Sequence, residues 1–200
     1  MRGLTLYLRS RRVPAALLSA AGSAVLMWSL TMAFAESRDA DPALVVLTVL
    51  LIVAAVTVTL AGPDEALDRT ASLAWQPRRA AHLLAAVALV LALLLPTLLT
   101  GARFGPAGLV LRDAAGLFGL TALGAVTIGV ARSWFLPLGW TLIALIFTHP
   151  DTTAGQILTW QSQAPGNVPA ALTAAAFAVA GLLAYALTGP TRPAAAEAAL

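Results

Sequence analysis

Residues 80–100 read AAHLLAAVALVLALLLPTLLT, an apolar run without Asp, Glu, Lys or Arg. The hydrocarbon core of a bilayer is about 30 Å thick, and a helix rising about 1.5 Å per residue crosses it in roughly 20 residues. The run is long enough for one crossing and offers nothing that would keep a helix surface soluble in water. It predicts a membrane-spanning helix.

Five further apolar runs are similar in composition, and four of them are similar in length. They cover residues 13–35, 43–61, 109–131, 134–148 and 168–188, of which 134–148 is the short one. Sixty per cent of the chain is apolar and ten per cent is charged, whereas about a quarter of a soluble domain is charged. The sequence therefore predicts an all-α, polytopic membrane protein with six spans in a single transmembrane domain over residues 1–200.

Two details of these runs need a decision. The stretch 109–148 is too long for one crossing, and an Arg at the bilayer centre costs about 2.5–3.5 kcal/mol on insertion scales, so a turn is predicted at Arg132. The first run follows several Arg residues and ends on Ala33-Phe34-Ala35, as a secretory signal peptide does. Its apolar part exceeds the usual length of roughly 7–15 residues, which favours a retained span.

The basic residues are all Arg, and their distribution predicts the orientation. With six spans, nine of the twelve fall on the side of the N-terminus, and the positive-inside rule places that side in the cytoplasm. Both termini are then cytoplasmic in a plasma membrane. The predicted anchors at the inner membrane surface are Arg9, Arg11, Arg12, Arg78 and Arg79. Residues 1–14 predict an interfacial helix, with a basic topology signal as the alternative.

Several functions lack their residues in this sequence. Without Lys there is no P-loop for ATP, and without Cys there is no disulfide or thiolate site. The two His residues, His82 and His149, fall at opposite membrane faces, so no His-ligated metal centre is expected. A pI near 10.6 does not indicate nucleic acid, because the Arg residues flank apolar runs. We expect no catalytic residues, no metal and no cofactor.

The predicted spans are nearly free of ionisable groups. The exceptions are His82 near the inner face and Arg112 with Asp113, which we expect at the outer interface. A carrier driven by protons or sodium usually has a carboxylate or His at mid-membrane, so the energy for any transport is expected from another subunit. Thr residues within the spans predict hydrogen bonds between helices.

The cytoplasmic loop after the second span predicts a short amphipathic helix. Gly62 can end the span, and Pro63 suits the first position of a new helix. Glu65 and Arg69 form an i,i+4 pair, and Pro77 ends the helix. One face of this helix is acidic and carries Asp64 and Asp68. Another face is apolar and carries Leu67, Ala71, Ala74 and Trp75. This helix is either a docking element for a cytoplasmic partner or a plain connection between spans.

The last outer loop, residues 149–167, predicts a second short helix. Asp151 can cap a helix that contains Ile157, Leu158 and Trp160. These apolar residues predict a piece that dips into the outer interface. Because the preceding span is short, part of this loop can complete the crossing as a re-entrant element, provided that protein or a water cavity surrounds its backbone.

With these features in place, the chain resembles the permease subunits of type-2 ABC exporters, particularly the compact ones of actinobacteria. The likeness covers nearly the whole chain: an interfacial N-terminal helix, six spans, a cytoplasmic helix after the second and a helical outer loop before the last. Its most specific part is the stretch from Gly62 to Thr70 that leads into Arg78 and Arg79.

The resemblance implies that the cytoplasmic helix is a coupling helix that docks on a separate ATPase subunit, which binds the ATP. Asp64, Glu65, Asp68 and Arg69 would transmit its motion, with Leu67, Thr70 and Ala71 packing nearby. A second permease copy or a paralogue would complete a dimer, surrounded by membrane lipid. Such permeases export drugs, antibiotics, peptides or lipids, some as resistance proteins. The alternative is a non-transporting regulatory or immunity protein that binds another membrane complex.

Overall fold

The computed structural model describes residues 12–35, 37–60, 75–146 and 152–191, and in these parts the chain is helical and contains no strand. The α-helices are α2 (Val13–Phe34), α3 (Pro42–Thr57), α5 (Trp75–Leu94), α6 (Ala107–Thr127), α7 (Phe135–Ile146), α8 (Thr153–Leu158) and α9 (Val168–Thr188). Three 3-10 turns join them: η1 (Val58–Leu60), η2 (Leu95–Leu99) and η3 (Val130–Arg132). The predicted all-α fold class is confirmed for the described parts.

Five stretches of the described chain are long and apolar enough to cross a membrane. They are Val13–Phe34, Pro42–Leu60, Trp75–Leu99, Ala107–Thr127 and Val168–Thr188. The sixth predicted run, 134–148, forms α7, whose 12 residues extend only about 18 Å at about 1.5 Å per residue. That length is well short of the hydrocarbon core, so the described residues contain five complete candidate spans.

Local sequence explains where the helices begin and end. The Asp41 side chain accepts a hydrogen bond from the Ala43 amide at 2.8 Å and caps α3. Asn167 caps α9 in the same way through the Ala170 amide at 2.9 Å. The predicted turn at Arg132 is confirmed, because α6 stops before it and η3 separates α6 from α7.

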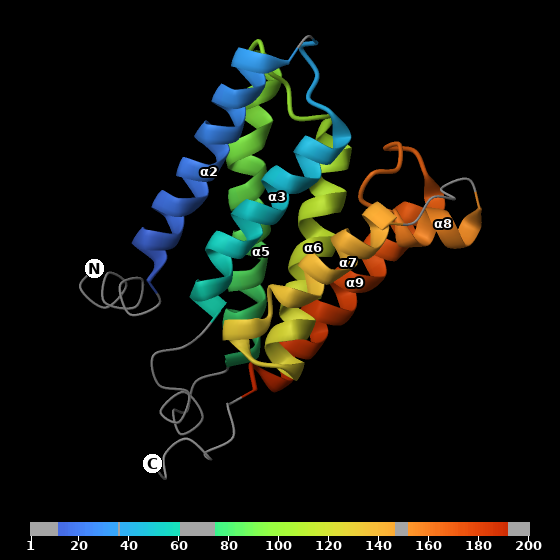
Figure 1. The fold of residues 1–200 in the computed structure, drawn as a ribbon. Coiled ribbons are helices and arrows are strands. Elements are labelled where there is room, and N and C mark those ends of the chain that lie inside the picture. Colours follow the sequence, from blue (N-terminus) through green and yellow to red (C-terminus); the bar gives the residue numbers. More distant parts are fainter. Residues whose placement is uncertain (1–11, 36, 61–74, 147–151, 192–200) are drawn as a thin grey trace.

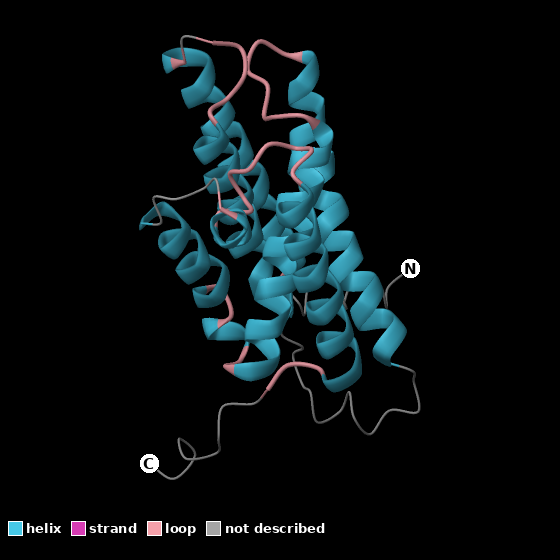
Figure 2. Cartoon of the chain, turned by 90° about the vertical axis from the view of Figure 1, so that its right-hand side faces the viewer, coloured by secondary structure: helices cyan, strands magenta, loops and turns pink. Residues whose placement is uncertain are grey.

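The helices run side by side, and their connections gather at two ends (Figures 1 and 2). One end carries residues 37–41 and 100–106, and we call it the outer end. There the Ala40 amide donates to the Arg103 carbonyl at 2.8 Å and the Arg103 amide to the Arg38 carbonyl at 2.7 Å. The other end carries η1, η3 and residues 189–191, and we call it the inner end. These names follow the predicted topology.

Helix α6 is the centre of the bundle. In the apolar part of α6, 78% of the residues are buried inside the protein. The share is 61% for the span that begins with α3, and between 22% and 28% for the spans of α2, α5 and α9. The peripheral helices expose large apolar side chains, among them Leu18 at 77%, Leu84 at 58% and Leu187 at 65%. An apolar surface of this extent suits lipid and would be a liability in water.

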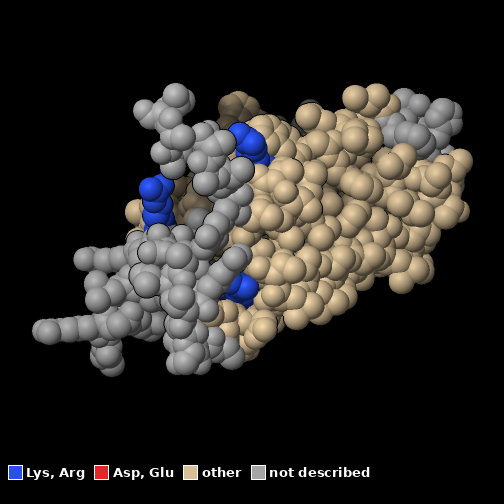
Figure 3. Space-filling view, turned by 90° about the horizontal axis from the view of Figure 1, so that it is seen from below, with Lys and Arg blue, Asp and Glu red and all other residues tan. Residues whose placement is uncertain are grey.

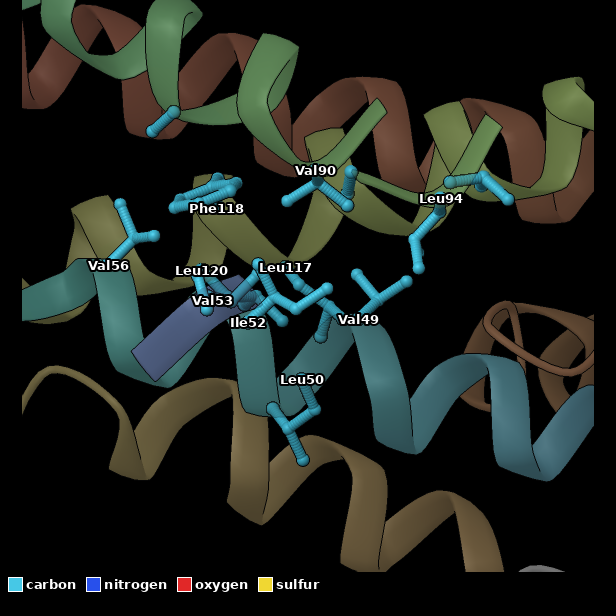
Figure 4. Packing of buried hydrophobic residues seen from close by; sticks show 14 of the residues in the cluster. Val49, Leu50, Ile52, Val53, Val56, Val90, Leu94, Leu117, Phe118 and Leu120 are labelled. Carbon is cyan, nitrogen blue, oxygen red and sulfur yellow. The ribbon is translucent and has the colours of Figure 1, made fainter. Parts of the chain in front are cut away.

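The core forms where α3, α5 and α6 meet. Val49 and Val53 from α3, Val90 and Leu94 from α5, and Leu117 from α6 are all fully buried in one cluster, and Figure 4 shows them converging. Within a bilayer, lipid is as apolar as these side chains, so close van der Waals packing rather than exclusion of water holds such helices together.

The most extensive helix contact, between α6 and α9, depends on glycine. A Cβ atom on Gly119 would overlap the Phe177 carbonyl of α9, and one on Gly181 would overlap the Gly119 carbonyl of α6. The two backbones therefore touch directly, as small residues permit in membrane helices. This contact leaves no room for any side chain.

Most Thr hydroxyls in the spans do not link helices, which corrects the prediction. Thr48, Thr57, Thr121 and Thr127 each donate to the carbonyl four residues earlier in their own helix, at 2.7–2.9 Å. A backbone carbonyl of the same turn is always within reach of a Thr hydroxyl, so the side chain is satisfied without a neighbouring helix.

The outer loop before α9 also differs in detail from the prediction. The cap of α8 is Thr152, whose hydroxyl accepts a hydrogen bond from the Gly155 amide at 3.0 Å, whereas the predicted cap Asp151 lies outside the described residues. Trp160 is fully buried in the protein rather than placed in the outer interface, because its ring packs where Gly116 of α6 leaves space.

The glycine contact predicts the effect of one added methyl group. Gly119→Ala should lower the thermal unfolding temperature in detergent, since the backbones must separate and overpacking costs about 1–3 kcal/mol. Gly108→Ala is the matched control on the same helix, because its Cβ would meet nothing within 4 Å. Equal unfolding temperatures for both variants would show that α6 and α9 do not touch at this point.

Candidate functional site

The residues predicted to couple the chain to an ATPase lie outside the described part. They are Asp64, Glu65, Leu67, Asp68, Arg69, Thr70 and Ala71, all within residues 61–74, and the anchors Arg9 and Arg11 lie outside it too. The structure does describe the two positions where this segment leaves and re-enters the bundle, Leu60 and Trp75. The candidate site is therefore built from what holds these two positions.

At the first position, the end of α3 is attached to α9. Leu60 is fully buried in η1, and its carbonyl accepts a hydrogen bond from the Tyr185 hydroxyl of α9 at 2.8 Å. Tyr185 is itself 1% exposed. A buried phenol needs a partner for its O–H group, and here that partner is the last described carbonyl before residue 61.

The same turn is attached to α5 through a second hydrogen bond. Thr59 Oγ1 lies 2.9 Å from His82 Nε2, and it also donates to the Val56 carbonyl at 2.8 Å. A hydroxyl has one proton to donate, so we assign the imidazole as the donor to Thr59. His82 is thus a structural contact between η1 and α5 at the inner end, as its predicted location implied.

At the second position, two of the predicted anchors make different contacts. The Arg78 guanidinium lies 5.4 Å from the ring centroid of Trp75, within the range of a cation–π contact. The Arg79 guanidinium packs against Gly189, which ends α9 with a φ of 71°. A cation at the C-terminus of a helix is stabilised by the helix dipole.

The C-terminal end of α9 therefore contacts the described chain before and after residues 61–74. Its Tyr185 holds Leu60, and its terminal Gly189 lies against Arg79. Two residues after Gly189, the Thr191 amide donates a hydrogen bond to the Ala125 carbonyl of α6 at 3.0 Å.

Toward the outer end, α6 contains a buried ion pair. Arg112 Nε lies 3.1 Å from Asp113 Oδ1, and the two side chains are 6% and 0% exposed. We expected both near the outer interface, and the structure adds that both side chains are buried within the protein. The segment between α8 and α9 folds over this part of α6 and shields the pair from the outside.

The guanidinium of Arg112 also holds that covering segment. Its Nη1 donates to the Ala164 carbonyl at 3.1 Å, and its Nη2 donates to the Gln161 carbonyl at 2.9 Å. The Gln161 side chain accepts a hydrogen bond from Thr141 of α7 at 3.0 Å. Arg112 thus joins α6 to the segment that precedes α9, and the Gln161 side chain joins that segment to α7.

This arrangement joins segments of the described chain. Asp113 is paired with Arg112, and in the described chain the pair contacts no hydroxyl nucleophile or His base. No group of three His, Asp or Glu side chains suited to a metal ion occurs among the described residues. The sequence marked Arg112 and Asp113, but only the fold shows what they hold.

An apolar groove of about 420 Å³ lies between α2, α3 and α5 in the inner half of the bundle. Small residues create it, including Ala16, Ala85 and Ala88, and its polar edge is the Thr59–His82 pair. Its volume is within the usual range for small-molecule sites.

Comparison of the chain with known protein families, with curated proteins and with solved structures found no match. The functional argument therefore stands on the residues and their geometry.

The buried ion pair predicts a clear stability effect. Asp113→Asn should lower the unfolding temperature in detergent, because it leaves the Arg112 charge buried and uncompensated, at a cost of about 3–5 kcal/mol. Asp39→Asn is the control, since Asp39 is exposed at the same end. If the two variants unfold at the same temperature, the pair is solvated and not buried.

Proposed function

We propose that the chain is the membrane-spanning permease subunit of an ATP-driven ABC exporter. The observation that carries this proposal is that the C-terminal end of α9 contacts the chain before and after residues 61–74, at Leu60 through Tyr185 and at Arg79 of α5 through Gly189. A segment flanked by these contacts is suited to receive force at the cytoplasmic face and pass it to a membrane helix.

The ionisable groups of the described spans support an external source of energy. Arg112 and Asp113 neutralise each other, and His82 is hydrogen-bonded at the inner end. A carrier that uses an ion gradient needs a group at membrane depth that gains and loses charge. The described part of the chain offers one buried carboxylate, Asp113, and it is paired with Arg112.

In this proposal, residues 61–74 form the coupling helix. Asp64, Glu65, Asp68 and Arg69 contact the ATPase subunit, which binds the ATP, and Leu67, Thr70 and Ala71 pack toward the membrane. A second copy of the chain or a paralogue completes the dimer. Both termini are cytoplasmic, and Arg12, Arg78 and Arg79 lie at the inner surface of the plasma membrane.

The sixth crossing belongs to the proposal as well. Helix α7 covers about 18 Å, and the segment with α8 and Trp160 then enters the protein instead of continuing outward. Backbone of this kind is tolerated at membrane depth where protein surrounds it, and Trp160 and Gln161 are 0% and 2% exposed. We place α7 and this segment together as one re-entrant crossing.

The cargo in this proposal is apolar or amphipathic, such as a drug, an antibiotic, a hydrophobic peptide or a lipid. The alanine-lined groove between α2, α3 and α5 has an apolar wall and one hydrogen-bonding edge, which matches such molecules. Export is the direction that the family resemblance implies.

The test separates docking from coupling. Purification in mild detergent should recover an ATPase subunit in fixed stoichiometry. The double reversal Glu65→Arg with Asp68→Arg should abolish that recovery while the chain still inserts into the membrane. Tyr185→Phe removes the hydroxyl that binds the Leu60 carbonyl. The ATPase subunit should still bind, but the permease should stimulate its ATP hydrolysis less.

Asp39→Arg at the outer end is the matched control and should change neither readout. An ATPase that binds and is stimulated equally in all variants would refute the coupling assignment. Recovery of the chain with another membrane complex and no ATPase would favour the alternative, a non-transporting regulatory or immunity protein.

A further inference from the structure

A second cavity, of about 580 Å³, lies at the inner end between the start of α2, the end of α3 and η3. Its wall contains one cation, Arg12, one aromatic ring, Trp134, and small or apolar side chains of α3 that include Ala54 and Val58. It shares no lining residue with the alanine-lined groove between α2, α3 and α5.

The positive charge at this cavity has no neutralising partner among the described carboxylates. These are Asp39, Asp41 and Asp113, of which the first two lie at the outer end and the third pairs with Arg112. Seen from the inner end, the described surface shows basic side chains and no acidic one (Figure 3). Among the described residues, the charge at the cavity is therefore positive, which suits an anionic occupant.

An apolar strip continues from the cavity toward the middle of the bundle. Ala54, Leu51 and Leu47 of α3 are exposed and recur every three or four residues, so they share one face of the helix. All three side chains are exposed, so the strip is accessible in the described structure. The occupant is thus expected to have a hydrocarbon part as well as an anionic part.

Trp134 supports a position at the membrane surface. Its ring is 38% exposed and stacks on Phe135 at 4.1 Å between centroids, while its Nε1 donates to the Ala131 carbonyl at 3.2 Å. Tryptophan with an apolar ring and a satisfied N–H group is typical of the level of the lipid headgroups. A free inorganic anion would use Arg12 but not the strip.

We propose that this cavity binds an anionic phospholipid, with its phosphate at Arg12 and an acyl chain along Leu51 and Leu47. Basic pockets between membrane helices on the cytoplasmic side are suited to such headgroups. The bound lipid would occupy the junction of α2, α3 and η3. The site does not depend on the exporter assignment, since it requires only that the bundle lies in a bilayer.

The experiment uses the full chain purified from nanodiscs that contain equal amounts of phosphatidylglycerol and phosphatidylcholine, with native mass spectrometry of the retained lipids. The wild type should retain phosphatidylglycerol in preference. Arg12→Gln should reduce that preference about fivefold, as expected for one cation near the membrane surface. Arg78→Gln removes an equal charge at the same end but outside the cavity, and should leave the preference unchanged.

A second variant and a competitor complete the test. Ala54→Phe fills the cavity without changing its charge and should also reduce retention. Excess inorganic phosphate should displace no lipid. The proposal would be overturned if Arg12→Gln and Arg78→Gln reduced the preference for phosphatidylglycerol equally. It would also be overturned if inorganic phosphate displaced the bound lipid. A wild type without a preference, as expected if a second copy or residues 1–11 cover the cavity, would overturn it as well.

Discussion

The direct contact between the backbones of α6 and α9 is the constraint on which the rest of the structure depends. It exists because Gly119 and Gly181 present no side chain at the crossing. With α9 this close, α6 is enclosed from one side by α9 and from the other by α3 and α5, and its own glycines and alanines suffice to fill the space. In a bilayer, where apolar burial gives little net gain between helices, such close packing is the main source of association.

The position of α9 determines what happens at both ends of the bundle. At the inner end it brings Tyr185 to the Leu60 carbonyl and Gly189 to Arg79, so that α3 and α5 are both fixed to it. Before its first residue, the chain is held on α6 by the two carbonyls that accept from Arg112. One helix thus connects a buried polar contact near the outer end with the segment that we propose to receive force from an ATPase.

Much of this could be predicted because membrane helices are specified by simple features. Long apolar runs gave the five complete candidate spans within a few residues, and Arg132 marked the turn between α6 and α7. Asp41 and Asn167 occupy cap positions that need no tertiary information. These features are local, and the cost of burying a charge or an unsatisfied backbone group in lipid leaves few alternatives.

The remainder depends on contacts between distant segments. Arg112 and Asp113 fall near the start of α6, where sequence alone suggests the outer interface, and only the fold of residues 159–165 over this turn buries them. The run of residues 134–148 reads as a span but forms a helix of 12 residues. Glycines that permit contact, such as Gly119, look no different in sequence from Gly108, where an added Cβ would meet nothing within 4 Å.

The central claim is that this bundle crosses a membrane with its basic, inner end in the cytoplasm. The chain has no Cys, so single cysteines can be placed without background at two exposed positions, Ser37 at the outer end and Arg132 at the inner end. The direct measurement is labelling by a membrane-impermeant maleimide in intact cells and after lysis. The account predicts that Ser37→Cys is labelled in intact cells and Arg132→Cys only after lysis; labelling of both in intact cells, or the reverse order, would contradict it.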